Sequence, residues 1–188
     1  MKNKNRFEVI IYGRGGQGVK SMAELLALAA AEEGKYVQAF PEFGPERSGA
    51  PIKAYFRMAT DPIRTREAIV DPDVAIVMDE DLLKSVDVFA GIEGHDQMII
   101  NSKKNKHQLW NELGRKANFI VVDAQNLSLK IIGENRPNVV MLGRFIFATE
   151  IIKLETLKKV FKEKYSSKIS SKKMVQNLLA MEQGYDIH

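Results

Sequence analysis

A glycine-rich turn near the start of the chain, Gly13-Arg14-Gly15-Gly16-Gln17-Gly18, constrains the fold more than any other feature. It matches the G-x-G-x-x-G pattern and stands between an apolar run at residues 7–12 and a helical pattern at residues 19–33. A second apolar run follows at residues 36–40. A glycine turn in this position is typical of a strand–helix–strand unit, because glycine permits both the tight turn and the close packing of helix on strand. The sequence therefore predicts an α/β fold.

The remaining pattern extends this unit into a sheet. Further apolar runs of strand length lie at residues 52–58, 73–79, 97–101 and 118–123. Residues 63–70 are expected to pair with residues 52–58 as an antiparallel excursion. Helices are expected at residues 107–114 and from residue 139 onward, with breaks near residue 153 and at residues 166–171.

This alternation predicts an α/β, Rossmann-like architecture of three layers, in which a mostly parallel (mixed) sheet carries helices on both faces. The length of 188 residues favours a single domain, with a core at about residues 7–152 and a helical, lysine-rich part at residues 153–188. That last part holds 8 lysines against 4 acidic residues and so carries the whole net charge of +4. A solvated helical face is the ordinary interpretation, and a docking patch for an acidic partner is the alternative. Nucleic acid is not expected, because the stretch contains no arginine and few aromatic residues.

The composition excludes several classes of chemistry. The sequence contains no cysteine, so it offers no thiolate nucleophile and no cysteine ligand for an iron–sulfur cluster. Its histidines, at positions 95, 107 and 188, lack the spacing of metal ligands. No apolar stretch approaches the roughly 18 to 20 residues that span a bilayer, and no signal-peptide pattern opens the chain. We expect a cytoplasmic protein that contacts no membrane and holds no metal.

The glycine turn is the first candidate binding site. The free N–H groups at the start of the following helix favour an anion, and polar or cationic side chains beside them add donors. The candidate cofactor-binding residues are Gly13, Arg14, Gly15, Gly16, Gln17, Gly18 and Lys20. A dinucleotide site also needs an acidic residue about 20 residues beyond the turn, to hold the ribose. The sequence has Gln38 there and places Glu42 only in the next loop.

A proline-bounded loop at residues 41–51 is the second candidate. Its prolines restrict φ and its glycines permit unusual turns, so a defined shape is expected. It leaves the sheet at the same edge as the glycine turn, where ligands of open α/β sheets bind. The candidate residues for a subunit interface or an active-site loop are Glu42, Phe43, Gly44, Pro45, Glu46, Arg47, Ser48 and Gly49.

Other residues carry weaker signals. Asp79, Glu80 and Asp81 form an acidic run that suits a metal or a general base, although a cap at the start of a helix is the commoner role. Trp110, like Phe43, is a candidate interface anchor. No complete catalytic set is apparent, so we assign no catalytic residue to this chain.

The glycine turn and the proline-bounded loop together resemble the gamma subunit of 2-oxoacid:ferredoxin oxidoreductases, most closely the pyruvate type. The stretches that carry the resemblance are residues 13–20 and residues 40–51, and the acidic strand end at residues 77–79 also fits. The likeness runs from about residue 7 to about residue 152 and is looser in the lysine-rich part.

The resemblance implies a multi-subunit enzyme that oxidatively decarboxylates a 2-oxoacid, forms an acyl-coenzyme A and passes electrons to ferredoxin. It implies that alpha, beta and cluster-bearing delta-type subunits hold thiamine diphosphate and the iron–sulfur clusters. The gamma chain would pack against them, contribute to the coenzyme A side and be inactive alone. The absence of cysteine agrees with this expectation.

Two alternatives stay open at this point. One is a self-sufficient NAD(P)- or flavin-dependent oxidoreductase built on the glycine turn. The other is an adaptor whose lysine-rich part recruits acidic ferredoxin. The sequence does not decide which 2-oxoacid is the substrate.

Overall fold

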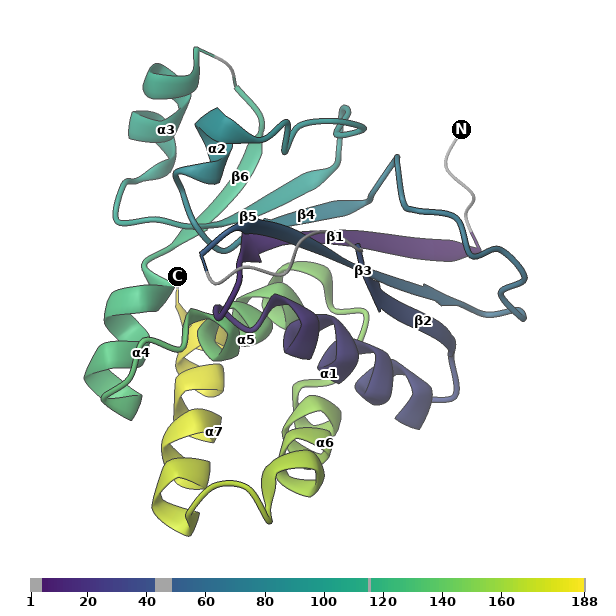
Figure 1. Cartoon of the computed structure of the whole chain (residues 1–188), viewed down its shortest axis with the longest axis vertical. Coiled ribbons are helices and arrows are strands. Elements are labelled where there is room, and N and C mark those ends of the chain that lie inside the picture. Colours follow the sequence, from purple (N-terminus) through teal and green to yellow (C-terminus); the bar gives the residue numbers. More distant parts are fainter. Residues whose placement is uncertain (1–4, 43–48, 115, 188) are drawn as a thin grey trace.

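The computed structural model describes residues 5–42, 49–114 and 116–187 and contains one six-stranded sheet covered by helices (Figure 1). The strands are β1 (Arg6–Arg14), β2 (Tyr36–Pro41), β3 (Pro51–Ala59), β4 (Val74–Val77), β5 (Gln97–Asn101) and β6 (Asn118–Val122). The helices are α1 (Val19–Glu32), α2 (Leu82–Ser85), α3 (Lys106–Leu113), α4 (Ala124–Ile132), α5 (Pro137–Thr149), α6 (Leu154–Tyr165) and α7 (Ser171–Asp186). The expected α/β class with a mixed sheet is confirmed.

The sheet has the strand order β2-β3-β1-β4-β5-β6. The pairs β1–β4, β4–β5 and β5–β6 are parallel, whereas β3 pairs antiparallel with both β1 and β2. Only β3 therefore runs against the other strands, so the sheet is mostly parallel as expected. The chain leaves β1, crosses through α1 to the edge strand β2 and then returns as β3 between the two.

One expected strand is absent. Residues 62–69 have no regular structure, so the prediction that residues 63–70 pair with residues 52–58 is wrong. The reason is that β3 is already paired on both sides, with β1 and with β2, and has no free edge for a further strand. Arg57 of β3, only 3% exposed, instead binds the irregular segment, since its guanidinium donates to the main-chain oxygen of Glu67 and also contacts Glu8 and Gln38. The side-chain amide of Gln38 in turn donates to the oxygen of Thr65 at 2.8 Å. Side chains of β2 and β3 thus hold two carbonyls of the irregular segment against the sheet.

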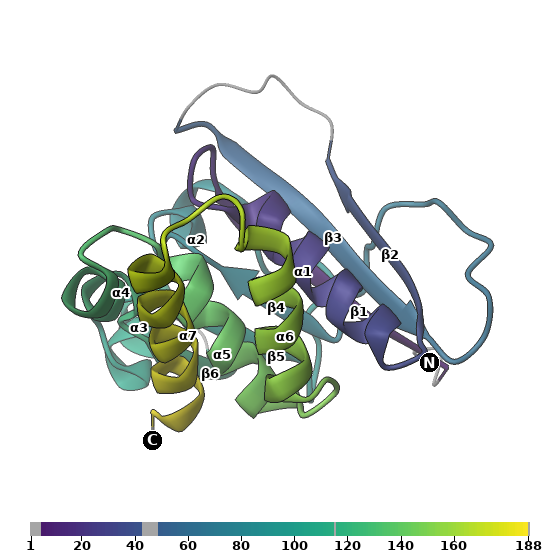
Figure 2. The ribbon, with the colours of Figure 1, turned by 90° about the horizontal axis from the view of Figure 1, so that it is seen from below.

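Each face of the sheet packs on its own apolar cluster. On one face, alternate strand residues such as Val9, Ile11 and Ile76 pack against α1, α5, α6 and α7. On the other, Ile10, Ala75 and Val77 pack with the short helix α2 and with Leu109 of α3. Figure 2, which views the chain from below, shows the crowded helical layer formed by α1, α5, α6 and α7. The three-layer arrangement follows from these two clusters.

The last helices belong to the core. Gly143 of α5 and Gly184 of α7 mark a close crossing, since a Cβ on Gly143 would lie 1.9 Å from the Met181 oxygen and one on Gly184 would lie 2.1 Å from the Val140 oxygen. Leu157 and Phe161 of α6 are buried in the same cluster. The predicted breaks near residue 153 and at residues 166–171 are confirmed, whereas α2 and α4 were not expected from the sequence.

Candidate functional site

The glycine turn has the geometry that only glycine supplies easily. Gly16 and Gly18 have φ values of 95° and 80°, in the left-handed region that other residues avoid. Gly13 serves close packing instead, because a Cβ there would lie 2.4 Å from Cγ2 of Val19 and 3.1 Å from Cβ of Met78. The turn therefore holds the start of α1 close to the end of β1.

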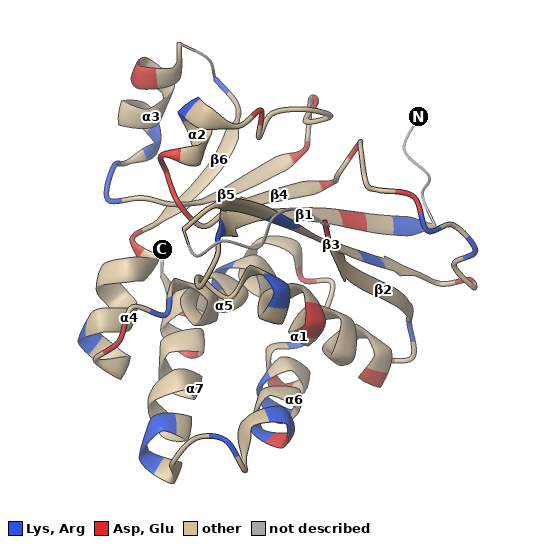
Figure 3. Cartoon of the chain, in the orientation of Figure 1, with Lys and Arg blue, Asp and Glu red and all other residues tan. Residues whose placement is uncertain are grey.

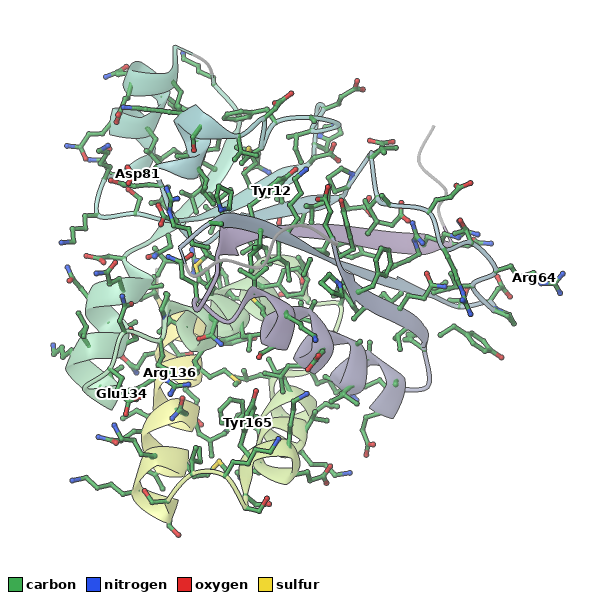
Figure 4. All side chains as sticks on the ribbon, viewed as in Figure 1. Tyr12, Arg64, Asp81, Glu134, Arg136 and Tyr165 are labelled. Atoms are coloured by element: carbon green, nitrogen blue, oxygen red, sulfur yellow. The ribbon has the colours of Figure 1, made fainter. Side chains whose placement is uncertain are left out.

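The start of α1 is open to a ligand. Gly18 is its N-cap residue and offers no side-chain hydrogen bond, so the first N–H groups of the helix are left without a side-chain acceptor. A hollow of about 340 Å³ adjoins them, lined by Gly16, Gln17, Gly18, Ser21, Glu134, Asn135, Arg136, Asn138 and Tyr165. Figure 4 labels Glu134 and Arg136, between α4 and α5, and Tyr165 at the end of α6. Amide donors thus face a single hollow together with Arg136, whose Nε donates to Oε2 of Glu134 at 3.0 Å. The amides suit an anion, which would share the Arg136 guanidinium with Glu134.

Sequence reasoning missed the residues that α4, α5 and α6 bring to this hollow. Arg136 precedes Pro137, the first residue of α5, and the side-chain nitrogen of Asn138 would lie 2.6 Å from a Cβ on Gly18. A proline at the first position is a known helix-start signal and could have marked the segment. Its proximity to the glycine turn depends on how α5 packs on the sheet, which no local pattern encodes.

Arg14 is engaged inside the turn. Its Nε donates to Oδ2 of Asp79 at 2.8 Å, and the same oxygen accepts from Nε2 of Gln17 at 3.3 Å. The Gln17 side-chain oxygen accepts from the Arg14 amide at 2.8 Å, which closes the turn on itself. Asp79, just after β4, therefore positions both polar side chains of the glycine turn. Lys20 is exposed on the first turn of α1.

The glycine turn contacts Gly49 and Ala50, the described end of the proline-bounded loop, as the sequence led us to expect. The amide of Gly15 donates to the Ala50 oxygen at 3.0 Å, and the amide of Gly49 donates to the Gly15 oxygen at 3.3 Å. Arg14 Nη1 also donates to the Gly49 oxygen at 3.2 Å. Of the loop candidates, Phe43, Gly44, Pro45, Glu46, Arg47 and Ser48 lie outside the described residues.

Glu42, at the other end of that loop, belongs to a polar cluster on β1 and β3. Its carboxylate accepts from the Tyr55 hydroxyl at 3.0 Å and lies 3.4 Å from Nζ of Lys53. Burial, with the nearby charges of Asp87 and Glu42, raises the pKa of Tyr12 to about 12. Burial and the hydrogen bond to Glu42 likewise raise the pKa of Tyr55 to about 12. Both tyrosines are neutral hydrogen-bonding groups at physiological pH. Tyr12 is labelled in Figure 4.

The acidic run after β4 has structural partners. Asp79 Oδ1 accepts from the Asp81 amide at 3.1 Å, and Glu80 pairs with Ser102 and Lys104. Across the described ranges, no three His, Cys, Asp or Glu residues are grouped as metal ligands.

Trp110 donates from its indole nitrogen to the Ala117 oxygen at 3.0 Å. Its role as an interface anchor stays a prediction.

Three lysines of the lysine-rich part pair with carboxylates elsewhere in the chain. Lys159 pairs with Glu32, Lys164 lies 2.8 Å from Glu24, and both carboxylates belong to α1. Lys158 and Lys173 also have acidic partners. Figure 3 shows these cations on α6 and α7. Ion pairing within the chain leaves less free charge for ferredoxin than the composition suggested.

No helix in the described part of the chain combines the length and the apolar character of a transmembrane span.

Comparisons with known proteins point to one family. The family model described as pyruvate ferredoxin/flavodoxin oxidoreductase matches residues 8–187. The chain is 42% identical over 166 residues to the pyruvate/ketoisovalerate oxidoreductases common subunit gamma of Thermococcus kodakarensis, which covers 88% of this chain and 90% of the relative. It is 38% identical over 183 residues to the pyruvate synthase subunit PorC of Thermotoga maritima, covering 97% of this chain and 95% of the relative.

Solved structures agree. The crystal structure of the pyruvate oxidoreductase subunit PORC from Thermotoga maritima superposes with a TM-score of 0.86 at 36% identity, covering 97% of both chains. A 2-oxoglutarate:ferredoxin oxidoreductase from Magnetococcus marinus matches with a TM-score of 0.76 at 20% identity, covering 97% of this chain and 31% of that one. The second match shows the fold alone.

Proposed function

The chain belongs to the pyruvate ferredoxin/flavodoxin oxidoreductase family, and from that premise we propose that it is the gamma subunit of a multi-subunit 2-oxoacid:ferredoxin oxidoreductase of the pyruvate type. The enzyme oxidatively decarboxylates a 2-oxoacid to an acyl-coenzyme A and CO2 and passes the electrons to ferredoxin. The gamma chain is one part of this oxidoreductase.

One structural observation supports the proposal most directly. Backbone hydrogen bonds from Gly15 to Ala50 and from Gly49 to Gly15 join the glycine turn to the proline-bounded loop. Residues 49 and 50 of the second stretch thus meet the glycine turn in a single rim at one edge of the sheet. A rim made of bare backbone and fixed turns suits contact with a partner chain or with a ligand shared between chains.

We propose that coenzyme A reaches this rim from a partner subunit. The uncapped start of α1 and the adjoining hollow of about 340 Å³ fit a phosphate, because amide donors and Arg136 face the same space. Gly16, Gln17 and Gly18 would supply the backbone cradle, and Lys20 would add a cation at its mouth. Arg14, held by Asp79, would keep Gly13 and Gly15 in place. Coenzyme A supplies the thiol that accepts the acyl group, and this chain binds and orients its phosphates.

Partner chains complete the chemistry in this proposal. Thiamine diphosphate and iron–sulfur clusters reside on alpha, beta and delta-type subunits, since this sequence has no cysteine to ligate a cluster. Glu42 and residues 43–49 contact those subunits. The name of the Thermococcus kodakarensis relative describes it as common to pyruvate and ketoisovalerate oxidoreductases. We therefore propose that the thiamine-binding partners, rather than the gamma chain, select the 2-oxoacid, and that the complex is cytoplasmic.

The NAD(P)- or flavin-dependent alternative gains no support. In a dinucleotide-binding fold the second parallel strand lies next to the first, and its acidic end residue holds the ribose. Here β3 occupies that position and separates β2 from β1. Gln38, at the place expected for the acid, binds Arg57 and the Thr65 oxygen.

Co-purification tests the proposed function. A tagged chain purified from its native cells should bring thiamine-binding and cluster-binding polypeptides, and the assembly should reduce ferredoxin only with pyruvate and coenzyme A together. The chain purified alone should be colourless and inactive. Recovery of a lone monomer from native extract, or micromolar binding of NADH, NADPH or FAD by that monomer, would contradict the proposal.

A further inference from the structure

The edge strand β6 exposes an unprotected backbone. Among the strands of the described residues it is the last in the sheet and pairs only with β5. Its sequence, Asn-Phe-Ile-Val-Val, contains neither proline nor a charged residue, which are the usual devices that keep a free edge from pairing. The opposite edge strand, β2, ends in Pro41. The β6 edge therefore retains the capacity to pair with another strand.

The pairing register identifies the main-chain groups of β6 that do not bond to β5. The Ser102 amide donates to the Val122 oxygen at 3.1 Å, and Val122 is the partner of Asn101 in the parallel ladder. Val122 and Ile120 consequently direct their main-chain groups toward β5, while Phe119 and Val121 direct theirs away. Within the described part of the chain, no other strand reaches the amide and carbonyl of Val121.

A hollow runs along this edge. Its volume is about 420 Å³, and its lining includes Phe119, Ile120, Val121 and Val122. Consecutive strand residues alternate between the two faces of a sheet, so a hollow that touches all of them follows the edge itself. An extended polypeptide fits such a hollow better than a compact ligand does.

The flanks of the hollow are basic. Its lining includes Lys103, Lys104, Lys106 and Arg144 of α5, against the single carboxylate of Asp123. Lys104 already binds Glu112 at 2.6 Å, which leaves Lys103, Lys106 and Arg144 as the cations without a carboxylate partner in the described residues. The Arg144 Nε is shielded from solvent and has no hydrogen-bond acceptor there. Arg144 Nη1 donates to the Ile187 oxygen, so the guanidinium has no carboxylate to balance its charge in the described residues. A carboxylate placed in the hollow would supply that balance.

We propose that the free edge of β6 receives an extended, acidic segment of a partner subunit, which adds a strand to the sheet and places carboxylates against Lys103, Lys106 and Arg144. Main-chain hydrogen bonds to Val121 would supply the pairing, and the cations would select acidic sequence. The proposal rests on the proposed assembly with other subunits and identifies a second contact, distinct from the glycine rim.

Hydrogen exchange at single amides tests the pairing. In the free chain the amides of Ile120 and Val122 should exchange slowly and that of Val121 fast. In the assembled complex the Val121 amide should slow by at least about tenfold. Unchanged exchange at Val121 in a complex that has formed would overturn the proposal, whereas failure of the complex to form would instead contradict the proposed function. Protection of Val121 in the free chain at high concentration would indicate pairing between copies of this chain and would also overturn it.

Charge reversal tests the acidic partner. The double variant Lys103→Glu/Lys106→Glu should slow assembly with the partner subunits by at least about tenfold at low salt. The matched control Lys162→Glu/Lys172→Glu changes the net charge equally at exposed sites on α6 and α7 and should assemble at the native rate. Equal slowing in both variants would overturn the proposal. Carbodiimide cross-linking of the native complex should join Lys103 or Lys106 to an Asp or Glu of a partner, and cross-links confined to this chain would count against it.

Discussion

Asp79 Oδ2 accepts a hydrogen bond from Arg14 Nε at 2.8 Å, and this contact changes the role that the sequence suggests for Arg14. The guanidinium that the sequence offers as a phosphate ligand is bound by a carboxylate from the next strand of the sheet. The pair is partly buried, with side-chain exposures of 30% for Arg14 and 19% for Asp79. Arg14 therefore contributes first to the shape of the turn.

The first prediction concerns that pair. Asp79→Asn removes the charge that Arg14 and Gln17 share and should lower the free energy of unfolding by about 1 to 2 kcal/mol. A double-mutant cycle with Arg14→Gln, measured by urea unfolding, should give a coupling energy of about 1 kcal/mol. Lys159→Gln, which breaks a more exposed pair with Glu32, is the control and should leave the free energy of unfolding nearly unchanged. Additive effects of the two substitutions would contradict the role assigned to Asp79.

The second prediction concerns the hollow beside α1. In the assembled enzyme, Arg136→Gln should raise the KM for coenzyme A by about three- to tenfold and leave kcat nearly unchanged, because the arginine would bind phosphate equally in ground and transition states. Lys20→Gln should act in the same direction. Lys35→Gln, beyond the far end of α1, provides the control. A fall in kcat at unchanged KM would argue against a phosphate-binding role.

The third prediction concerns the crossing of α5 and α7. A glycine-to-alanine change inside a helix ordinarily stabilises it by about 1 kcal/mol. Gly143→Ala and Gly184→Ala should do the opposite and lower the free energy of unfolding by about 2 to 3 kcal/mol, since each new methyl group meets a carbonyl of the other helix. Thermal or urea unfolding measures the effect. Gln183→Ala, at an exposed position of α7, should change stability by less than about 0.5 kcal/mol. Stabilisation by either alanine would show that the helices lie further apart.

The fourth prediction concerns Glu112. Hydrogen bonds from Lys104 and then Lys84 lower the pKa of its carboxyl from 4.5 to about 2. Because the pKa of Glu112 is lower in the folded than in the unfolded chain, the ionised carboxylate stabilises the folded state. This stabilisation is fully present above pH 4.5 and is lost as the pH falls toward 2. Carbon-detected NMR titration should place the midpoint near pH 2. Glu112→Gln should flatten the dependence of the urea midpoint on pH across this range, with Glu93→Gln as the matched control. A midpoint near pH 4.5 in the native chain would refute the assignment.

The sequence predicted the elements whose signals are local. The apolar runs and the glycine stops located most strands and helices, and the spacing of the two characteristic loops placed them at one edge of the sheet. Helix α4 was not predicted, although both of its ends carry a sequence signal. The Asp123 side chain caps the start by accepting from the Asn126 amide at 3.1 Å, and Gly133 follows the last residue. The helix between these two signals is only 9 residues long, so its apolar pattern is brief.

Other features depend on tertiary packing and had no local signal. Residues 62–69 form no strand because β1 and β2 occupy both edges of β3, and the buried guanidinium of Arg57 binds the Glu67 carbonyl of this irregular segment. The partner of Arg14 could not be named before the order of β1 and β4 was known. The crossing of Gly143 and Gly184 joins helices that are separated by the whole of α6.

The antiparallel strand β3 also determines when the sheet can begin to fold during synthesis. β1 emerges from the ribosome before both of its neighbours in the sheet, so it has no partner until β3 (residues 51–59) has followed and has both partners only after β4 (residues 74–77). Nascent chains shorter than that leave an apolar strand and an amphipathic helix unsheltered. Growing cells that halt translation inside this interval should therefore direct the fragment to chaperones or proteases rather than release a stable intermediate.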